Sequence, residues 1–521
     1  MNTLARRNRP ALTALLQIAT ACLVGFVVAL LPQHQLILLA AVIAAVLAVA
    51  AIFAEPTLGL ALALIVGPFQ PLERVMLQLP LDSGQLVLIL TLIAYSFRWL
   101  ATRRFPVIRP QPAIAVTFAA FITACLISFF PARDFRDWAT ECIKWLQIAV
   151  VALLVAGEQD PRKRWIVLGA ILVSAAGQAA FGLIQADVRG FGPPEFRIRG
   201  TDAYRAYGTF EQPNPFGGFM GLTWPVAAAL ALWAAAQLES MLCSRGFRPL
   251  ARTNGAQWRI FLLLVTSTLV AGLCIRALVA SGSRGALVGA GAAAVVVALV
   301  LLRHPWRWVG SAFVLALALF ALDVINIPAS LEAQLRYFSD PGSAFGLDVR
   351  NAHVTPITFS TIERLAHWQA ALRMIESSPW LGVGFGNYAA AYPEFRLLPW
   401  ENALGHAHNY YLNIFAEMGV IGLLAYLALW SVIVLITWRT VRRRGHRALS
   451  AAVCVGVLGA WVHLTAHHLF DKLYVANMHL LIGAYLGFVI AAAKVYHPQH
   501  DAHTHSAYEP AAPERCAGAS L

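Results

Sequence analysis

HAHNYYLNIFAEMGVIGLLAY, residues 406–426, joins a long polar segment to an apolar helix. His408 and Asn409 stand where that helix begins, and Glu417 stands two turns further in. A glutamate inside an apolar helix is costly unless it faces protein or a wet cavity. The stretch therefore predicts the lip of a site between helices at one end of a membrane bundle. A simpler interpretation makes His408 an interfacial residue and Asn409 a helix N-cap.

The composition of the whole chain extends this interpretation. Of 521 residues, 59% are apolar and only 12% are charged, and apolar runs near twenty residues recur from end to end. Only helices and closed barrels span lipid, and the runs lack the alternation of a barrel strand. We therefore predict an all-α polytopic transmembrane helix bundle of about 12–14 spans, with a large extracytoplasmic loop containing amphipathic helices. The candidate spans are 11–31, 35–54, 57–70, 85–100, 112–130, 141–157, 165–185, 214–236, 260–281, 285–302, 308–327, 409–437, 449–469 and 473–493.

The third of these stretches is short and ends at Gly67-Pro68, so a re-entrant segment is an alternative there. Orientation follows from the basic residues beside the spans. With both termini in the cytoplasm, most Lys and Arg fall on the inner side. The formal charge of +13 is thus a signal of topology and does not indicate nucleic acid binding. The seven cysteines stand singly, without a CxxC pair, so they predict no disulfide framework.

This topology divides the chain into six segments. They are N-terminal transmembrane helices (1–185), an extracytoplasmic loop (186–213), central transmembrane helices (214–327), a large extracytoplasmic loop (328–408), C-terminal transmembrane helices (409–493) and a disordered cytoplasmic tail (494–521). Within the large loop, helical spacing of apolar residues predicts an amphipathic helix lying on the membrane or over the site. These residues are Leu365, Trp368, Ala371, Leu372 and Ile375. The glycines of GVGFGNY, residues 382–388, predict a flexible loop, and without a βαβ unit they do not indicate nucleotide binding.

Three arginines on the predicted outer side are candidate ligand-binding residues. Arg284 stands among small residues in ASGSRGALVGA, where a close backbone approach and a helix N-terminus would favour an anion. Arg205 lies in RAYGTFEQPNPFGG, and Arg364 opens the amphipathic helix. The simpler interpretations are a snorkelling interface residue for Arg284, a loop charge for Arg205 and a solvated helix face for Arg364.

These residue types suit chemistry at a diphosphate. Guanidinium groups make paired, charge-assisted hydrogen bonds to phosphate oxygens. A nearby histidine can take a proton from an attacking hydroxyl, because its pKa lies near the working pH. His406 with His408, or His467 with His468, would supply two ligands of a metal, but the sequence shows no third ligand. We therefore expect neither a metal nor another cofactor.

The chain resembles the O-antigen ligase and O-antigen polymerase superfamily of bacterial membrane glycosyltransferases. Three blocks carry the resemblance: RAYGTFEQPNPFGGFMGL, then ASGSRGALVGA, then residues 363–388 together with 406–426. The resemblance implies a metal-independent, inverting transferase at the outer face of the cytoplasmic (inner) membrane. Its donor is a glycan on undecaprenyl diphosphate, and its acceptor is a hydroxyl of another glycan, lipid A core or protein.

The same resemblance implies roles for individual residues. His408 is then catalytic, and Arg205, Arg284 and Arg364 hold the diphosphate. From the residues themselves we expect Asn409, Glu417 and His406 to support the site. His406 is an alternative to His408 as the working histidine. Ligase, polysaccharide polymerase and protein O-oligosaccharyltransferase stay open as activities. A membrane transporter of a small anion is the alternative from another class, although the chain shows no internal repeat of the kind common in transporters.

Overall fold

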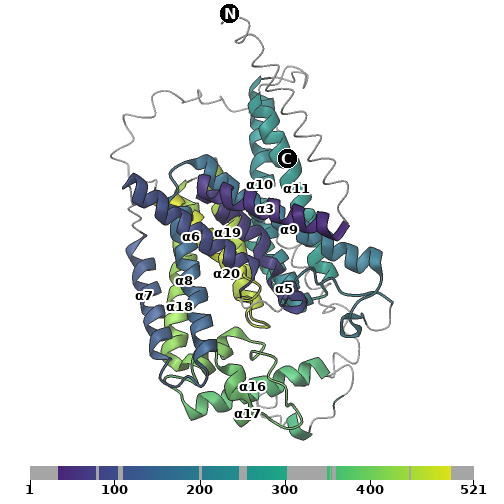
Figure 1. The fold of residues 1–521 in the computed structure, drawn as a ribbon, viewed down its shortest axis with the longest axis vertical. Coiled ribbons are helices and arrows are strands. Elements are labelled where there is room, and N and C mark those ends of the chain that lie inside the picture. Colours follow the sequence, from purple (N-terminus) through teal and green to yellow (C-terminus); the bar gives the residue numbers. More distant parts are fainter. Residues whose placement is uncertain are drawn as a thin grey trace, which may run out of the picture. The chain divides into compact units, whose positions relative to one another are not determined.

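A computed structural model describes residues 33–77, 81–103, 110–198, 202–245, 255–301, 349–351, 354, 359–444 and 448–494. These parts are helical and contain no β-strand, only one isolated bridge between Arg197 and Tyr204. Nine of their helices are long and apolar enough to cross a membrane. The protein is therefore an all-α polytopic helix bundle, as its composition predicts. Figure 1 shows the ribbon.

Twelve of the fourteen predicted spans coincide with helices of the structure. The other two, 11–31 and 308–327, and the predicted tail beyond 494 lie outside the described residues. The short third stretch is part of a longer candidate span, Pro56–Leu77. It is made of α4 (Pro56–Val66), a 3₁₀ turn (Gly67–Phe69) and α5 (Gln70–Leu77). The contacts within the chain define two units, and the borders between them fall inside α4 and inside α6 (Ser83–Thr102).

The first unit comprises residues 1–59 and 88–103. Its described helices are α3 (Gln33–Ala54), the start of α4 and most of α6 (Ser83–Thr102). An ion pair of 3.1 Å joins Arg98 to Glu55, and the hydroxyls of Thr57 and Tyr95 lie 3.3 Å apart.

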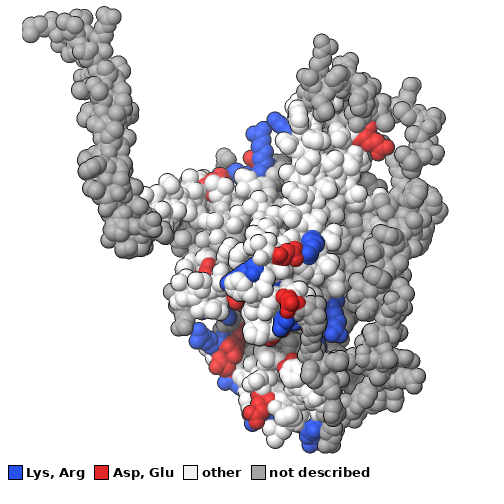
Figure 2. Space-filling view, turned by 90° about the vertical axis from the view of Figure 1, so that its right-hand side faces the viewer, with Lys and Arg blue, Asp and Glu red and all other residues white. Residues whose placement is uncertain are grey.

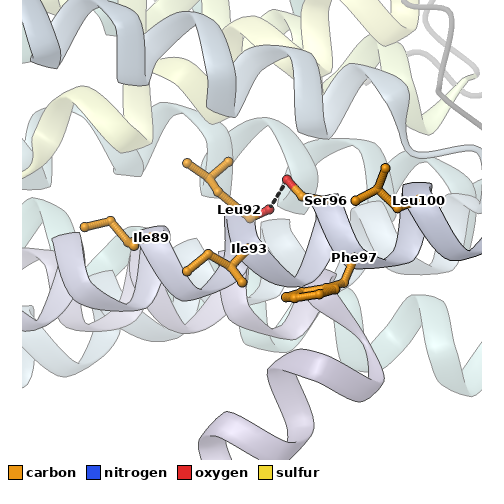
Figure 3. Close-up of a pocket in the computed structure, with 6 residues that line it drawn as sticks. All are labelled: Ile89, Leu92, Ile93, Ser96, Phe97 and Leu100. Carbon is orange, nitrogen blue, oxygen red and sulfur yellow. Dashed lines mark hydrogen bonds between the residues drawn. The ribbon is translucent and has the colours of Figure 1, made fainter.

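One face of α6 forms an apolar groove (Figure 3). It is lined by Ile89, Leu92, Ile93, Ser96, Phe97 and Leu100. The only hydroxyl among them, that of Ser96, donates to the Leu92 carbonyl of its own helix at 2.8 Å. The groove therefore offers no polar group to a substrate, and its apolar lining suits lipid.

The second unit, residues 60–87 and 104–521, contains all the candidate site residues. Six of its helices lie between residues 112 and 301. They are α7 (Pro112–Ile127), α8 (Phe135–Gly157), α9 (Pro161–Leu183), which continues into a π-helical turn at Ile184–Arg189, α10 (Pro213–Arg245), α11 (Gly255–Ala280) and α12 (Arg284–Leu301). Capping fixes where two of them begin, because the Asp134 and Asp160 carboxylates accept hydrogen bonds from Asp137 N and Arg162 N.

The later helices are α16 (Phe359–Ser377), α17 (Tyr388–Phe395), α18 (Tyr410–Arg444), α19 (Leu449–His467) and α20 (Met478–Lys494). In the bundle, α10 packs on α11 and α19, α12 packs on α19, α18 packs on α7, and α20 packs on α8. Close backbone approach needs small residues. At Gly456 of α19, for example, a Cβ atom would lie 2.4 Å from the Cα of Val226 in α10.

The predicted amphipathic helix is α16, and it packs against protein. Leu365, Ala371 and Ile375 are buried in a core with residues of α17 and of the segment between α17 and α18. Trp368 and Leu372 are partly buried against the same core. Both α16 and α17 contact α18, so they sit at one end of the bundle, which we call the α16–α17 end (Figure 1). On the face drawn in Figure 2, the charged side chains of the described residues gather mainly in the lower half.

Candidate active site

Arg205 lies in the segment that precedes α10 and is held by Asn214 of α10 and by Ser281, which follows α11. Its Nε donates to the Ser281 carbonyl at 2.6 Å, and its Nη2 donates to Asn214 Oδ1 at 2.9 Å. The backbone beside it is fixed as well, since Ala206 N donates to the Ala280 carbonyl at 2.9 Å. These bonds join the first two blocks of the family resemblance and hold the guanidinium beside the start of α12.

Arg284 is the first residue of α12 and is exposed. The residue before it, Ser283, accepts from Leu287 N at 3.0 Å through its carbonyl and from Ala286 N at 3.4 Å through its hydroxyl. Gly282 lies one residue further back in the left-handed region, with φ of 59°. This turn is tight against Arg205, because a Cβ atom on Gly282 would lie 3.2 Å from Arg205 Nε.

The three candidate arginines converge. Burial, together with the guanidinium groups of Arg364 and Arg284, lowers the pKa of Arg205 to about 10. Burial also lowers the pKa of Arg364, and Arg284 adds to this effect while Asp471 opposes it. Guanidinium groups that repel one another in this way favour the binding of an anion between them. Phosphate oxygens are well suited to such a set of donors.

The histidines lie beside the same carboxylate. His406 Nε2 donates to Asp471 Oδ1 at 2.6 Å, and His408 Nδ1 lies 4.0 Å from that oxygen. The two imidazole rings are 4.5 Å apart between centroids. His408 has a left-handed backbone, with φ of 51°, just before α18 begins. Asn409 caps the helix, since its Oδ1 accepts from Leu412 N at 3.1 Å, as the simpler interpretation predicted.

The surroundings keep the His408 imidazole neutral. Burial and then the neighbouring His406 lower the pKa of His408 to about 3, while the Asp471 carboxylate opposes them. Burial alone would raise the pKa of Asp471, but the His406 hydrogen bond and the nearby imidazoles bring it below its usual range. A neutral imidazole can accept a proton, and a bound anion would make this one more basic by offsetting the arginine charges.

His367 of α16 is a third imidazole of the site, which the sequence analysis missed. Its ring lies 5.6 Å from that of His408 and stacks on Tyr392 at 4.9 Å. The Tyr388 hydroxyl donates to the His367 carbonyl at 3.1 Å and lies 3.0 Å from His367 Nδ1. Since that hydroxyl has one proton, Nδ1 of His367 carries its own. Burial lowers the pKa of His367 to about 4.

Asp471 was also missed. It belongs to HHLFDKLY, which connects α19 to α20 and carries an adjacent acid and base between two apolar stretches. Such a pair in a short connection is a signal that could have been noticed. Its partner histidine, however, stands 65 residues earlier in the chain, and no local pattern reveals that pairing.

Glu417 faces protein. Its side chain is 1% exposed, and its Oε1 accepts from Tyr388 N at 3.1 Å. Two residues later the backbone of α18 leaves the helical region at Gly419, with φ of 63° and ψ of −167°. The chain from residue 379 to 388 fits into this break, with Val420 N donating to the Pro379 carbonyl at 2.9 Å and Gly384 N donating to the Glu417 carbonyl at 2.8 Å.

The glycine-rich stretch 382–388 is therefore a packed junction, and the prediction of a flexible loop is not what the structure shows. At Gly384, φ is 105° and a Cβ atom would lie 2.4 Å from the Cα of Ala132. Asn387 fastens the same stretch to the α7–α8 connection, because its Oδ1 accepts from Arg133 N at 2.7 Å and Asp134 N at 2.5 Å. These small residues allow tight packing here and do not indicate mobility.

His406, His408 and Asp471 also form a set that could hold a metal ion, since their ligand atoms lie within 4.8 Å of one another. Asp471 supplies the third ligand that the sequence analysis lacked. Two imidazoles and a carboxylate suit zinc. Arg364 acts electrostatically on His408 and Asp471, and Arg205 acts on Asp471, so these guanidinium groups disfavour a cation there and favour an anion.

Comparison with known proteins finds a family match over the part of the chain that carries most of the candidate site residues. Residues 269–427 match the family model described as O-Antigen ligase. The matched stretch contains Arg284, Arg364, His406, His408 and Glu417, whereas Arg205 precedes it and Asp471 follows it. A search of curated proteins found no match. The family match indicates glycan transfer of the O-antigen ligase type in general. The match covers residues 269–427 of this chain and supports its resemblance to the O-antigen ligase and O-antigen polymerase superfamily.

Proposed function

We propose that this protein is a membrane glycosyltransferase that moves a glycan from undecaprenyl diphosphate to an acceptor hydroxyl. The observation that carries the proposal is the convergence of Arg205, Arg284 and Arg364 on one site with His408. The ligase or polymerase reaction would take place at the outer face of the cytoplasmic membrane. The α16–α17 end would then face outward, both termini would lie in the cytoplasm, and the six-segment division would hold.

The arginines bind and stabilise the leaving group in this proposal. As the bond between the anomeric carbon and the phosphate oxygen breaks, the electron pair stays on the diphosphate. Positive groups fixed in place beforehand stabilise that developing charge without reorganisation. The Ser281 and Asn214 bonds hold Arg205 in this way. Because three guanidinium groups supply the positive charge, the reaction needs no metal ion.

His408 accepts the proton of the acceptor hydroxyl. The acceptor oxygen forms the new bond to the anomeric carbon from the face opposite the diphosphate, so a single displacement inverts that carbon. Asp471, 4.0 Å from His408 Nδ1 and bonded to His406, stabilises the imidazolium that results. His406 and Asn409 support this arrangement, and Glu417 holds the junction beside it.

Purified protein in lipid nanodiscs, given an undecaprenyl-diphosphate-linked glycan and an acceptor, tests the proposal. We expect transfer and release of undecaprenyl diphosphate in the presence of a chelator. His408→Ala and Arg284→Ala should each lower the rate by about 100-fold or more. Arg276→Ala is the control, since Arg276 is an exposed residue of α11 paired with Asp187. The proposal is wrong if both site variants keep the wild-type rate.

A deletion strain separates the activities of the superfamily. Full-length glycan left on its lipid carrier means that the protein is a ligase. Loss of long chains, with a single repeat still attached, means that it is a polymerase. Loss of glycoprotein staining indicates a protein O-oligosaccharyltransferase. Anion uptake into sealed liposomes, without any glycan transfer, would instead mean that it is a transporter.

A further inference from the structure

Four ionisable side chains are buried together behind the candidate site. Glu141 of α8 accepts from Lys144 Nζ at 2.5 Å and from Lys472 Nζ at 3.1 Å, through the same Oε1. Glu417 of α18 interacts electrostatically with Lys472. The side chains of Glu141 and Lys472 are each 9% exposed. The group thus combines two acidic and two basic side chains, and we call it the Glu141 cluster.

The Glu141 cluster is adjacent to the site through one peptide bond. Lys472 follows Asp471, and Asp471 Oδ1 accepts from Lys472 N at 2.9 Å. The Asp471 side chain meets His406, whereas the Lys472 side chain meets Glu141. Burial alone would lower the pKa of Lys472, but the carboxylates of Glu141 and Glu417 raise it. The ammonium group therefore stays charged and keeps its hold on Glu141.

The cluster also reaches the third imidazole. Glu417 accepts from Tyr388 N at 3.1 Å, and the Tyr388 hydroxyl donates to the His367 carbonyl, whose ring contacts His408. Two chains of contacts therefore start from the Glu141 cluster. One leads from Lys472 through Asp471 to His406, and the other leads from Glu417 through Tyr388 and His367 to His408. The connection through Lys472 is the shorter of the two, because only Asp471 lies between Lys472 and His406.

Stability alone does not account for these charges. Among the described residues, Glu141 Oε2 and Glu417 Oε2 are buried without a hydrogen-bond partner. Buried ion pairs with unsatisfied atoms are often no more stable than apolar residues of the same volume. Their presence is better explained by what they position, since charged groups fix a geometry more narrowly than apolar contacts do.

We propose that Lys472 is a positioning residue, which holds Asp471 in place against His406 and His408 through its ion pair with Glu141. This inference rests on the proposed function. Lys472 does not touch the reacting atoms; it acts through Asp471. Its loss should therefore slow the chemical step and leave binding of the lipid diphosphate unchanged.

The test compares Lys472→Met, Asp471→Asn and the double variant in the nanodisc transfer assay. Because a displacement of about 1 Å at a catalytic group can cost up to 100-fold, we expect Lys472→Met to lower kcat by roughly 10- to 100-fold. The KM for the lipid-linked donor should change little. The double variant should be no slower than Asp471→Asn alone, since both changes remove the same arrangement. Three results would each overturn the proposal. They are a double variant whose loss of kcat is the product of the two single losses, a raised KM for the donor in Lys472→Met, and an unchanged kcat in Lys472→Met.

Lys144→Met is the matched control. Lys144 bonds the same oxygen of Glu141 but does not adjoin Asp471. We expect it to lose thermal stability about as much as Lys472→Met while keeping a kcat close to the wild-type value. An equal loss of kcat in both variants means that the cluster is only structural. If Lys472→Met does not accumulate in the membrane, Lys472→Arg is measured in its place. A kcat of at least half the wild-type value supports the proposal, and a loss of kcat as large as that of Asp471→Asn contradicts it. If the wild-type protein itself transfers no glycan, the proposed function has failed first.

Discussion

His406 Nε2 and Asp471 Oδ1 stand 65 residues apart in the chain and share a hydrogen bond of 2.6 Å. His406 lies just before α18, and Asp471 lies just after α19. The same two helices are joined at this end by the backbone, because Tyr410 N donates to the His468 carbonyl at 2.8 Å. The pairing brings the connection after α19 to His406 and His408. The family match includes these two histidines but ends before Asp471.

Asp471→Asn should lower glycan transfer by about 100-fold, because the imidazolium that forms on His408 loses its nearby negative charge. Asparagine keeps the size of the side chain, so we expect normal membrane insertion. The transfer assay in nanodiscs measures the effect. Asp187→Asn is the control, since Asp187 is exposed and pairs only with Arg276 among the described contacts. Equal rates for Asp471→Asn and the wild type would remove Asp471 from the site.

His367→Phe should make the protein less sensitive to acid. Burial lowers the pKa of His367 to about 4, from an ordinary value near 6.5. Below about pH 6.5 the unfolded chain binds a proton that the folded chain does not, so stability falls as the pH falls toward 4. The shift corresponds to about 3 kcal/mol, which phenylalanine would not lose.

Apparent Tm values of both proteins at pH 7.5 and pH 4.5 check this prediction. We expect the drop in Tm on acidification to be smaller in His367→Phe than in the wild type. The comparison uses the difference between the two pH values within each protein, so a general loss of packing cancels. The same drop in both proteins would show that His367 does not titrate with unfolding.

Gly384→Ala should destabilise the junction between the α16–α17 end and the bundle. The new methyl group would lie 2.4 Å from the Ala132 Cα, and φ of 105° is strained for any side chain. Overpacking of this kind costs about 1–3 kcal/mol, and the backbone strain adds to it. Gly169→Ala in α9 is the matched control, because nothing lies within 4 Å of its Cβ position.

Thermal unfolding and limited proteolysis of the two variants measure the difference. We predict earlier cleavage between residues 359 and 408 in Gly384→Ala, and wild-type behaviour or a small gain in stability in Gly169→Ala. Cleavage at wild-type rates in Gly384→Ala would mean that the stretch is free to move, as its glycine content alone suggests.

The sequence predicted the elements with a strong local pattern. Helical spacing located α16, and continuous apolar runs located the bundle helices, because period and length are properties of neighbouring residues. The segments around Arg284 and His408 could be identified for a similar reason, because polar residues that interrupt apolar stretches are a local feature of the sequence. The structure brings Arg205, Arg284, Arg364 and His408 together, while their roles remain proposals.

Long-range partners were beyond the reach of these patterns. Asp471 and Lys472 look like an ordinary charged connection until α18 and α19 bring them to His406 and Glu141. The break of α18 at Gly419 was also not predicted, since small residues in an apolar run are equally typical of close helix packing. Likewise, only the packed partner Ala132 distinguishes the junction at Gly384 from a flexible loop.

Binding of undecaprenyl diphosphate to the purified protein in nanodiscs tests the central claim most directly. Arg205→Gln, Arg284→Gln and Arg364→Gln should each raise the Kd by about 10-fold or more, since a hydrogen bond to a charged group contributes roughly 1.5–3 kcal/mol. Arg276→Gln, on the exposed face of α11, should bind like the wild type. Wild-type affinity in all three site variants would show that these arginines do not form a diphosphate site, and it would contradict the account.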